Sequence, residues 1–515
     1  MDTRRRHFER RVLAGFALVA VATVGVAYGV ASLRNSIVHA AGRLAPQPIQ
    51  YPGFPVPAAR IQAWIAANNV EAMRQHAWDL WKGINAITPE SQGYPVWETW
   101  YSGPEIGDQS KGTCAPSSLT ELLSGPERSA GQPTHDFQIP EQFHHGPFAR
   151  RRLAATSTAE NTGAVTVLEE VTVKFDADYA QFVLNNHYCD ATTLWKLQES
   201  WGTQPLVNRH IKEFPRTAIG LKPTYEFVNG PNHNNGITLV NYWKGDLTTG
   251  PENSTNYEFP TPDTWAQCVV VNTGSGGVPP GLHCAITNDS GTVSPSGVVG
   301  IDQFYHFPIT AAQATAVCQQ NQVPEGQCPL QAGDYAILVG MHMSTKEDKE
   351  WTWQTFWWNY GSTFPYGPPP AGIPAPFNHY AMAAGYSMTV QKHPNGPNTL
   401  AYNPYLETGL GPSVHGTNST CMSCHTVASL GNNPNSNWPS GGNPPDSPNS
   451  GSGYPAFYSG QLYDYTVWNP TAQKAFYDCM TTTDTSWFVQ GFAGSGPDNQ
   501  PPCVLTSSVG KPAKH

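Results

Sequence analysis

The residues whose types and spacing point most directly to chemistry are Cys421, Cys424 and His425, within the stretch NSTCMSCHTV. Two thiols three positions apart can form thioether bonds to the two vinyl groups of one haem, and the imidazole that follows then lies beneath the ring as an axial ligand of the iron. The pattern occurs once in the chain. The sequence therefore predicts one covalently bound haem c, attached at Cys421 and Cys424, with His425 as the proximal ligand.

Other cysteine chemistries need a context that this motif lacks. A thioredoxin-type redox disulfide follows a strand near the start of its domain and opens a long helix, and a zinc site needs a second Cys or His pair at comparable spacing. Neither context surrounds residues 421 to 425. Spacing and order together favour haem attachment.

The distal ligand of the haem iron has several candidates. His342 is flanked by two Met residues on a predicted strand, where alternation would direct the imidazole to one face and both Met side chains to the other. Met480 lies 55 residues after His425 and is the weaker alternative, because Met commonly fills gaps in a core. Met422 lies between the attached cysteines and cannot reach the opposite face. The remaining alternatives are His415, His379 and Met382, or a sixth position that is open or holds water.

No other catalytic pattern stands out. The chain has no nucleophile–base–acid arrangement, glycine-rich phosphate loop or dinucleotide fingerprint. His144, His145, Glu347 and Asp348 lack metal-site spacing, and we interpret them as parts of solvated loops. An aromatic cluster on one predicted strand consists of Trp351, Trp353, Trp357 and Trp358. It could stack a sugar or quinone or line a haem crevice, although aromatic residues on strands mostly belong to a core.

Disulfides are expected from the remaining cysteines. The chain has ten, and the eight outside the haem motif are an even number suited to an oxidising compartment. Connectivity does not follow from sequence alone. Proximity along the chain favours Cys114 with Cys189, Cys268 with Cys284, Cys318 with Cys328, and Cys479 with Cys503.

An export segment opens the chain. Five Arg residues between positions 4 and 11 precede an uncharged run over residues 12–33. This run reaches the roughly 20 residues needed to span a bilayer, which favours an uncleaved anchor in the inner membrane with its basic flank in the cytoplasm. Cleavage of a signal peptide near Ala40, which would secrete the protein, and a twin-arginine signal at Arg5-Arg6 are the alternatives. Either way, we expect a periplasmic location.

Composition indicates a folded, loop-rich protein and an acidic exported part. Apolar residues make up 39% of the 515, only 13% are charged, and 48 Gly with 47 Pro favour turns over long helices. Residues 1–40 hold six Arg and two acids, so the rest has 22 basic and 36 acidic side chains, a formal charge of −14. Nucleic acid is therefore excluded as a partner, and a basic protein patch or a small molecule is favoured.

The elements that must position the haem motif can be read from periodicity and caps. Helical spacing over residues 58–85 is interrupted at Asn68-Asn69, and Asp or Thr caps precede helices at 176–186, 190–200 and 310–318. Predicted strands are 164–175, 237–243, 268–272 and, most convincingly, the pair 334–346 and 351–360, joined by a charged turn that we expect to face solvent.

Four segments follow from these patterns: a signal or membrane anchor at 1–40, a Pro-rich spacer at 41–57, a helical start with a β-rich region at 58–400, and a haem-attachment region at 401–515. The predicted fold class is α+β and β-rich, with an N-terminal anchor helix, a large mixed or antiparallel β region, short helices and long Gly/Pro-rich loops. It is not the usual small cytochrome c fold, because the helices expected after the haem motif are replaced by the Gly/Pro-rich stretch 429–453.

Several stretches besides the haem motif carry a family resemblance: HAWDLW (76–81), PVWETW (95–100), FPRTAIGLKP (214–223), and LVGMHM (338–343) followed by WTWQTF. With them, the chain resembles membrane-anchored monohaem c-type cytochromes that have a large N-terminal region and one late C-x-x-C-H motif. The resemblance implies a periplasmic haem protein and brings no assigned substrate.

Three functions are compatible with these observations. The first is electron transfer, in which a covalently attached haem exchanges single electrons with a redox partner protein or a small-molecule donor or acceptor. The second is a haem-dependent oxidoreductase with a substrate pocket in the large N-terminal region. The third is a haem-bearing module that binds carbohydrate or protein. The sequence favours the first.

Overall fold

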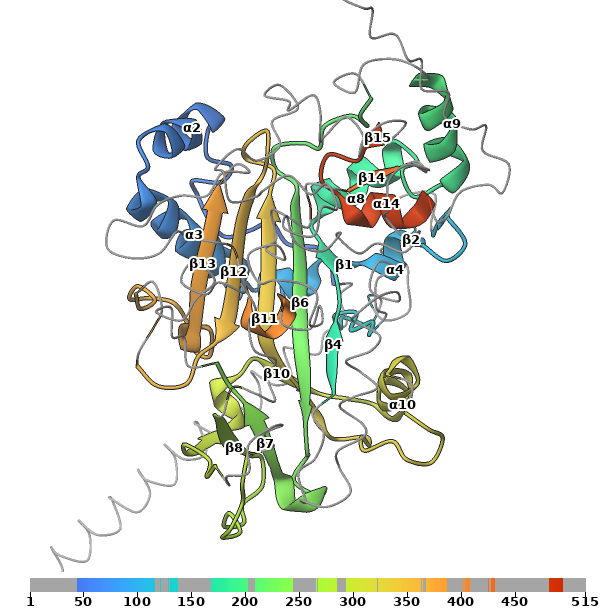
Figure 1. Ribbon diagram of the computed structural model, residues 1–515. Helices are drawn as coiled ribbons and strands as arrows, with labels where there is room; N and C mark the ends of the chain where they lie inside the picture. The colour runs from blue at the N-terminus through green and yellow to red at the C-terminus, as the bar shows by residue number, and fades with distance from the viewer. Residues whose placement is uncertain are drawn as a thin grey trace, which may run out of the picture.

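The molecule is known from a computed structural model, shown in Figure 1. The structure describes residues 44–115, 121, 128, 130–137, 168–201, 209–243, 265, 267–284, 293–321, 323–362, 364, 367–386, 401, 403–407, 425, 428–430 and 481–493.

An antiparallel sheet forms the centre of the molecule, with the strand order β1-β5-β6-β11-β12-β13 (Figure 1). Two short strands lie off this path, where β4 pairs with β6 and β10 pairs with β11. The bounds are β1 Tyr101–Ser102, β4 Glu169–Val171, β5 Lys174–Phe175, β6 Ile219–Val228, β10 His306–Pro308, β11 Tyr335–Thr345, β12 Thr352–Trp358 and β13 Tyr380–Tyr386. The protein is thus a β-rich α+β structure, as the sequence predicts.

The apolar strand β11 is the buried central strand that its composition predicts. It lies between β6 and β12, and its register places His342 opposite Lys222 on one neighbour and Thr355 on the other. The protein has two hydrophobic cores, and Met341 and Met343 pack in the larger one. Because side chains alternate along a strand, His342 belongs to the other face of the sheet. The predicted alternation is therefore confirmed.

Two helices near the N-terminus cover one face of the sheet. They are α2 Ala58–Ala66 and α3 Val70–Ile84, with the predicted break between them, where Asn68 has a φ of 47° and Asn69 caps α3 by accepting from the Ala72 N–H. On α3, Trp81 stacks on Phe356 of β12 with ring centroids 4.0 Å apart. This face is therefore filled by aromatic packing.

The second core is assembled from segments that are far apart in the sequence. Its helices are α4 Gly103–Ile106, α8 Ala177–Asn185, α9 Ala191–Trp201 and α14 Trp487–Ala493, and its small sheets are β2 Gly107–Asp108 with β3 Thr113–Cys114 and β14 Ser429–Leu430 with β15 Thr481–Thr482. Phe175 packs on Tyr179 and on Phe488, with ring centroids 4.3 Å apart in both pairs. The C-terminal elements thus pack directly against the start of α8 and the edge of the sheet (Figure 1).

A smaller sheet and a helix extend the other end of the molecule. The sheet contains β7 Ile237–Asn241, β8 Cys268–Asn272 and β9 Val298–Gly300, with β8 and β9 parallel. The helix is α10 Ala311–Gln320, capped by Thr310 as predicted. Short helical turns complete the description: η1 Val96–Thr99, η4 Asn234–Gly236, η7 Ile301–Gln303, η8 Phe377–His379 and α11 Pro404–Glu407.

Three of the four predicted disulfides are confirmed. Cys114 is bonded to Cys189, Cys268 to Cys284, and Cys318 to Cys328. The fourth predicted pair, Cys479 with Cys503, lies outside the described residues. Disulfides of this kind are compatible with an oxidising compartment such as the periplasm.

The charged turn between β11 and β12 differs from the sequence prediction. Glu347 and Asp348 are buried at 0% and 1% exposure, whereas we expected a solvated loop. Glu347 accepts from the Val56 N–H at 2.7 Å, and Asp348 accepts from Gln62 Nε2. The partners come from segments nearly 300 positions earlier, which explains why local composition failed here.

Residues 44–57 form no helix, as their Pro content predicts, but a turn closed by the Phe54 N–H and the Tyr51 carbonyl interrupts the extended chain, and the segment lies along the body of the protein. Leu44 donates its N–H to the Arg128 carbonyl, Trp100 Nε1 donates to the Gln47 carbonyl, and Gln50 donates its N–H to the Gly83 carbonyl. Among the described residues, no helix is long and apolar enough to cross a membrane. The predicted anchor at 12–33, the cleavage site near Ala40, and His144 with His145 lie outside those residues.

Candidate haem-binding site

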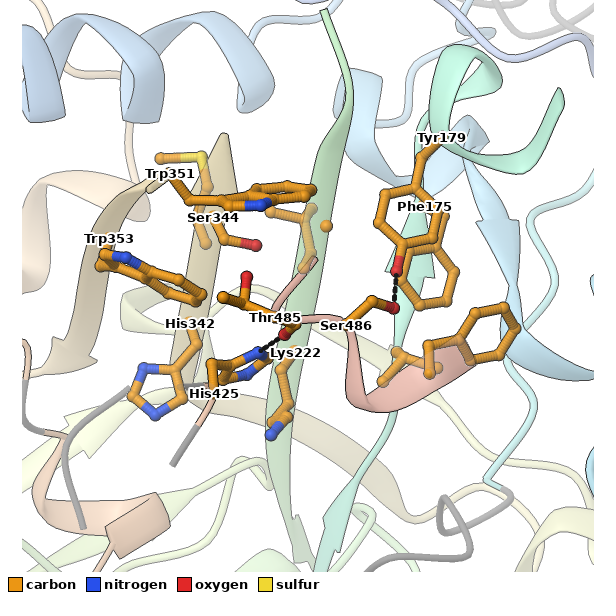
Figure 2. Close-up of a pocket in the computed structure, with 15 residues that line it drawn as sticks. Phe175, Tyr179, Lys222, His342, Ser344, Trp351, Trp353, His425, Thr485 and Ser486 are labelled. Atoms are coloured by element: carbon orange, nitrogen blue, oxygen red, sulfur yellow. Dashed lines mark hydrogen bonds between the residues drawn. The ribbon is translucent and has the colours of Figure 1, made fainter. Parts of the chain in front are cut away.

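His425, the predicted proximal ligand, lies in a cavity between the central sheet and the second core (Figure 2). The cavity is partly open to solvent. Its walls combine aromatic and polar side chains. They are Val173, Phe175, Tyr179, Gly220, Leu221, Lys222, His342, Met343, Ser344, Trp351, Trp353, His425, Thr485, Ser486 and Phe488.

One hydrogen bond fixes the orientation and tautomer of His425. Its Nδ1 lies 2.7 Å from the Thr485 carbonyl oxygen, and a carbonyl can only accept, so Nδ1 carries the proton. In the neutral imidazole the lone pair is then on Nε2. This is the pattern of metal-binding histidines, in which one ring nitrogen donates to a carbonyl and the other faces the metal.

The surroundings keep His425 neutral. Burial, followed by the positive charge of Lys222, lowers the pKa of His425 to about 3. At neutral pH the imidazole is therefore uncharged and its Nε2 can donate a lone pair to a metal.

The Thr485 carbonyl is itself held in a buried turn. Asp484 and Thr485 both have positive φ angles, of 49° and 62°. The Asp484 carboxylate accepts from Lys346 Nζ at 2.6 Å and from the Phe214 N–H at 2.8 Å, and the Asp484 carbonyl accepts from Trp351 Nε1. These contacts tie the acceptor of His425 to the sheet, so the ring is held in one orientation.

His342, the predicted distal ligand, lines the same cavity as His425 (Figure 2). It is 8% exposed, and burial, then the charge of Lys222, hold the pKa of His342 well below its ordinary value. Two neutral imidazoles from positions 83 residues apart therefore line one cavity. Two imidazoles are one of the ligand pairs with which a protein can hold a haem iron.

The other sequence candidates are placed elsewhere or lie outside the described residues. His379 ends η8 and Met382 is on β13, and neither is among the residues that line the cavity. Cys421 and Cys424, the predicted attachment points, and Met480 and His415 lie outside the described residues. Across the residues that the structure does describe, no group of three His, Cys, Asp or Glu is placed to hold a metal ion.

The tryptophan cluster forms no exposed platform. Trp351 and Trp353 are each 2% exposed, Trp357 is 1% exposed and Trp358 is fully buried. Trp353 lies against His425, with ring centroids 4.8 Å apart and planes at 49°. The sequence allowed these side chains either to stack a sugar or quinone or to line a haem crevice. Trp351 and Trp353 line the cavity, and none of the four Trp side chains offers a flat surface for carbohydrate.

Sequence reasoning missed two residues of the candidate site. Lys222 lies on β6, a strand that is not among those predicted from the sequence, so nothing in the local pattern pointed to it. Thr485 contributes a main-chain carbonyl, which no residue type encodes. Both become recognisable only when the strands and the C-terminal turn are placed together.

The cavity fits a haem by the chemistry of its walls. A haem needs a neutral imidazole with its lone pair presented to iron, apolar walls for the macrocycle, and a second ligand or open space on the distal side. His425, the Trp351 and Trp353 wall, and His342 supply these features. Comparison of the chain with protein-family models, with characterised proteins and with solved structures found no match to any of them.

Proposed function

We propose that the protein is a periplasmic monohaem c-type cytochrome that carries single electrons through a haem attached covalently at Cys421 and Cys424. The observation that carries the proposal is the orientation of His425, directly after the second attachment cysteine, toward an aromatic-lined cavity with its lone pair on Nε2. The resemblance to membrane-anchored monohaem cytochromes supports the same class.

The haem, when bound, supplies one-electron iron chemistry. The chain supplies the environment that sets how this chemistry runs. His425 would hold the iron through Nε2, and its hydrogen bond to the Thr485 carbonyl would raise the basicity of that ligand. His342 on β11 would supply a second imidazole ligand, and Trp351 and Trp353 would cover part of the macrocycle with apolar surface. An iron that has no free ligand position would favour electron transfer over reaction with a substrate at the metal.

Electrons are exchanged with a redox partner protein or with a small-molecule donor or acceptor. The acidic charge of the chain after residue 40 favours a partner with a basic patch. The segment 12–33 would anchor the protein in the inner membrane, so the partner would lie at the same surface.

The decisive experiment is expression of the full chain with the cytochrome c maturation machinery, followed by denaturation and extraction with acidic acetone. We expect the red colour to stay with the polypeptide, and C421S/C424S to lose it to the solvent. The matched control is M422L, which changes the residue between the attachment points and should retain covalent haem. A wild-type chain that releases its haem, or never acquires one, would refute the proposal.

A further inference from the structure

Backbone strain gathers at the cavity around His425. Trp351, Asp484 and Thr485 have positive φ angles of 63°, 49° and 62°. Asp tolerates this left-handed conformation, but it is unusual for a bulky residue such as Trp or a β-branched residue such as Thr, and it costs free energy. Trp351 and Thr485 both line the cavity. Outliers of this kind persist only where the surrounding contacts hold them in place.

Residues 483–486 form a tight turn with an unfavourable residue in it. The Ser486 N–H donates to the Thr483 carbonyl at 2.9 Å, and both central residues have positive φ, which is the pattern of a type I′ turn. Such turns favour Gly at the second central position, because a side chain is strained there. Here that position is Thr485, whose carbonyl accepts the Nδ1–H of His425 (Figure 2). The strained residue is thus the one that orients the proposed iron ligand.

The turn between β11 and β12 holds this segment from the side of the sheet. Trp351 Nε1 donates to the Asp484 carbonyl at 3.1 Å, and Lys346 Nζ lies 2.6 Å from the Asp484 carboxylate. Trp351 is 2% exposed and Asp484 is 8% exposed, so these contacts are buried. We call the contacts of Trp351 and Lys346 with Asp484 the clasp. It joins strained residues of two turns that lie 133 positions apart.

The clasp acts on the residue that holds His425. The Asp484 carbonyl belongs to the peptide group that joins Asp484 to Thr485, so fixing it limits the rotation of the Thr485 carbonyl that follows. We propose that Trp351 is a positioning residue for the proximal ligand: through the Asp484 carbonyl it keeps the Thr485 carbonyl on His425 Nδ1 and thereby lowers the reduction potential of the haem. This inference rests on the proposed function, because it requires a haem on His425.

The expected sign follows from the hydrogen bond. A carbonyl that accepts from the ring raises the basicity of the imidazole, and a more basic ligand stabilises ferric iron relative to ferrous iron. Without the indole N–H of Trp351, the Thr485 carbonyl is free to turn away from His425. The hydrogen bond to Nδ1 then weakens and the reduction potential rises.

The reduction potential of the intact holoprotein tests this role. W351F removes the indole N–H and keeps an aromatic wall, and we expect it to raise the potential by about 59 mV, which corresponds to a tenfold change in the relative affinity for ferric iron. The matched control is W100F, which removes a similarly buried indole N–H that donates to the Gln47 carbonyl outside the cavity, and it should leave the potential unchanged. An unchanged potential in W351F overturns the inference, even if the variant is less stable.

A second measurement needs no haem, so it covers the case in which W351F fails to acquire one. Nitrogen NMR of the full C421A/C424A chain, labelled with ¹⁵N-histidine, distinguishes the two neutral tautomers of His425, whose signals are assigned by their loss in H425Q. We expect the Nδ1–H tautomer when Trp351 is present, and a mixture with the Nε2–H tautomer after W351F. W100F should keep the Nδ1–H tautomer. A W351F chain with an unchanged tautomer would rule out the positioning role.

The outcomes separate the two proposals. If the wild-type chain acquires no covalent haem, the proposed function fails, and the effect on the potential fails with it. If haem is attached and W351F alters neither the potential nor the tautomer, only the inference on Trp351 fails. If W351F shifts the potential and leaves the tautomer unchanged, the shift comes from the polarity of the cavity wall, and the positioning role is rejected.

Discussion

At the scale of single residues, the proposed haem ligation depends on the orientation of His425. A histidine after a C-x-x-C pair binds iron only if one ring nitrogen is free of its proton and points at the metal. The Thr485 carbonyl determines which nitrogen that is, and burial keeps the ring neutral. The orientation of the proposed proximal ligand is thus set by a main-chain group 60 positions away.

The role of His342 leads to a spectroscopic prediction. If His342 is the distal ligand, as we propose, the wild-type haem should be low-spin and unresponsive to carbon monoxide. H342A should shift the iron to high spin and allow carbon monoxide to bind, as visible spectra would record. H379A, which changes a histidine outside the cavity, is the control. A low-spin H342A would exclude this residue as the ligand and move Met480 to first place.

The ion pair behind Thr485 leads to a second prediction. Lys346 and Asp484 are 2% and 7% exposed at their side chains, and their charged atoms lie 2.6 Å apart. Burial raises the pKa of the Asp484 carboxyl, so without Lys346 the aspartate would be a costly buried charge. K346M should lower the free energy of unfolding by about 3 kcal/mol in a urea titration.

A companion variant separates charge from packing at this site. D484N in the K346M background removes the remaining charge, so the double variant should regain part of the lost stability. If K346M and the double variant are equally unstable, the loss comes from packing against Trp351, whose ring lies 5.5 Å from Lys346 Nζ.

At the scale of elements, a buried cluster of charges ties η1 to the edge of the sheet. Glu98 of η1 lies 3.1 Å from His135 Nε2 and 3.7 Å from Lys174 Nζ of β5, and it is fully buried. Burial alone would raise the pKa of Glu98, but His135 and Lys174, with a hydrogen bond from Tyr305, lower it below its ordinary value. The contact therefore stabilises the fold only while Glu98 is ionised.

The sign of this pKa shift gives a pH-dependent prediction. A carboxyl whose pKa is lower in the folded state adds stability above its unfolded pKa, near 4.3, and loses that contribution as the pH falls through the folded value. E98Q should therefore be less stable than the wild type at pH 7, with the difference narrowing below about pH 4. Chemical denaturation at several pH values measures it. The control is E71Q, an exposed residue of α3; a constant difference for E98Q would contradict the assignment.

Elements also show where sequence prediction succeeds and where it stops. Local patterns predicted the break between α2 and α3 at Asn68, the pairing of β11 with β12, and three disulfides. Periodicity, helix caps and proximity along the chain are enough for these features. Burial of the turn at Glu347 could not be predicted from local sequence. Its two acids accept hydrogen bonds from Val56, which precedes α2, and from Gln62 on α2. The meeting of His342 with His425 is also a long-range event. It depends on how the C-terminal segment packs on the sheet, which alternation alone does not encode.

At the scale of the whole molecule, the candidate site lies where two hydrophobic cores meet. The larger core fills the α3 face of the sheet, and the smaller one joins α8, α9 and α14. Trp351 and Trp353 belong to the smaller core and also line the cavity. Stability of the second core and integrity of the cavity are therefore linked.

The Cys114–Cys189 disulfide is the covalent link within that second core, which makes its removal informative. It closes a loop of 75 residues, whereas Cys268–Cys284 closes 16 and Cys318–Cys328 closes 10. In the chain-entropy account, the stability that a disulfide adds grows with the logarithm of loop length. Replacing the first pair by Ala should then cost about 1.8 kcal/mol more than replacing the third, with the second pair in between.

Urea unfolding of the three double-Ala variants, followed by circular dichroism, measures this order. C268A/C284A and C318A/C328A act as internal controls, because they remove the same chemical bond far from the haem cavity. The cavity adds a second readout, since loosening the second core in C114A/C189A should also broaden the haem absorption bands while the other two variants keep theirs. Equal losses in all three would mean that the disulfides act through local native-state contacts, and that the chain between Cys114 and Cys189 is already restrained in the unfolded state.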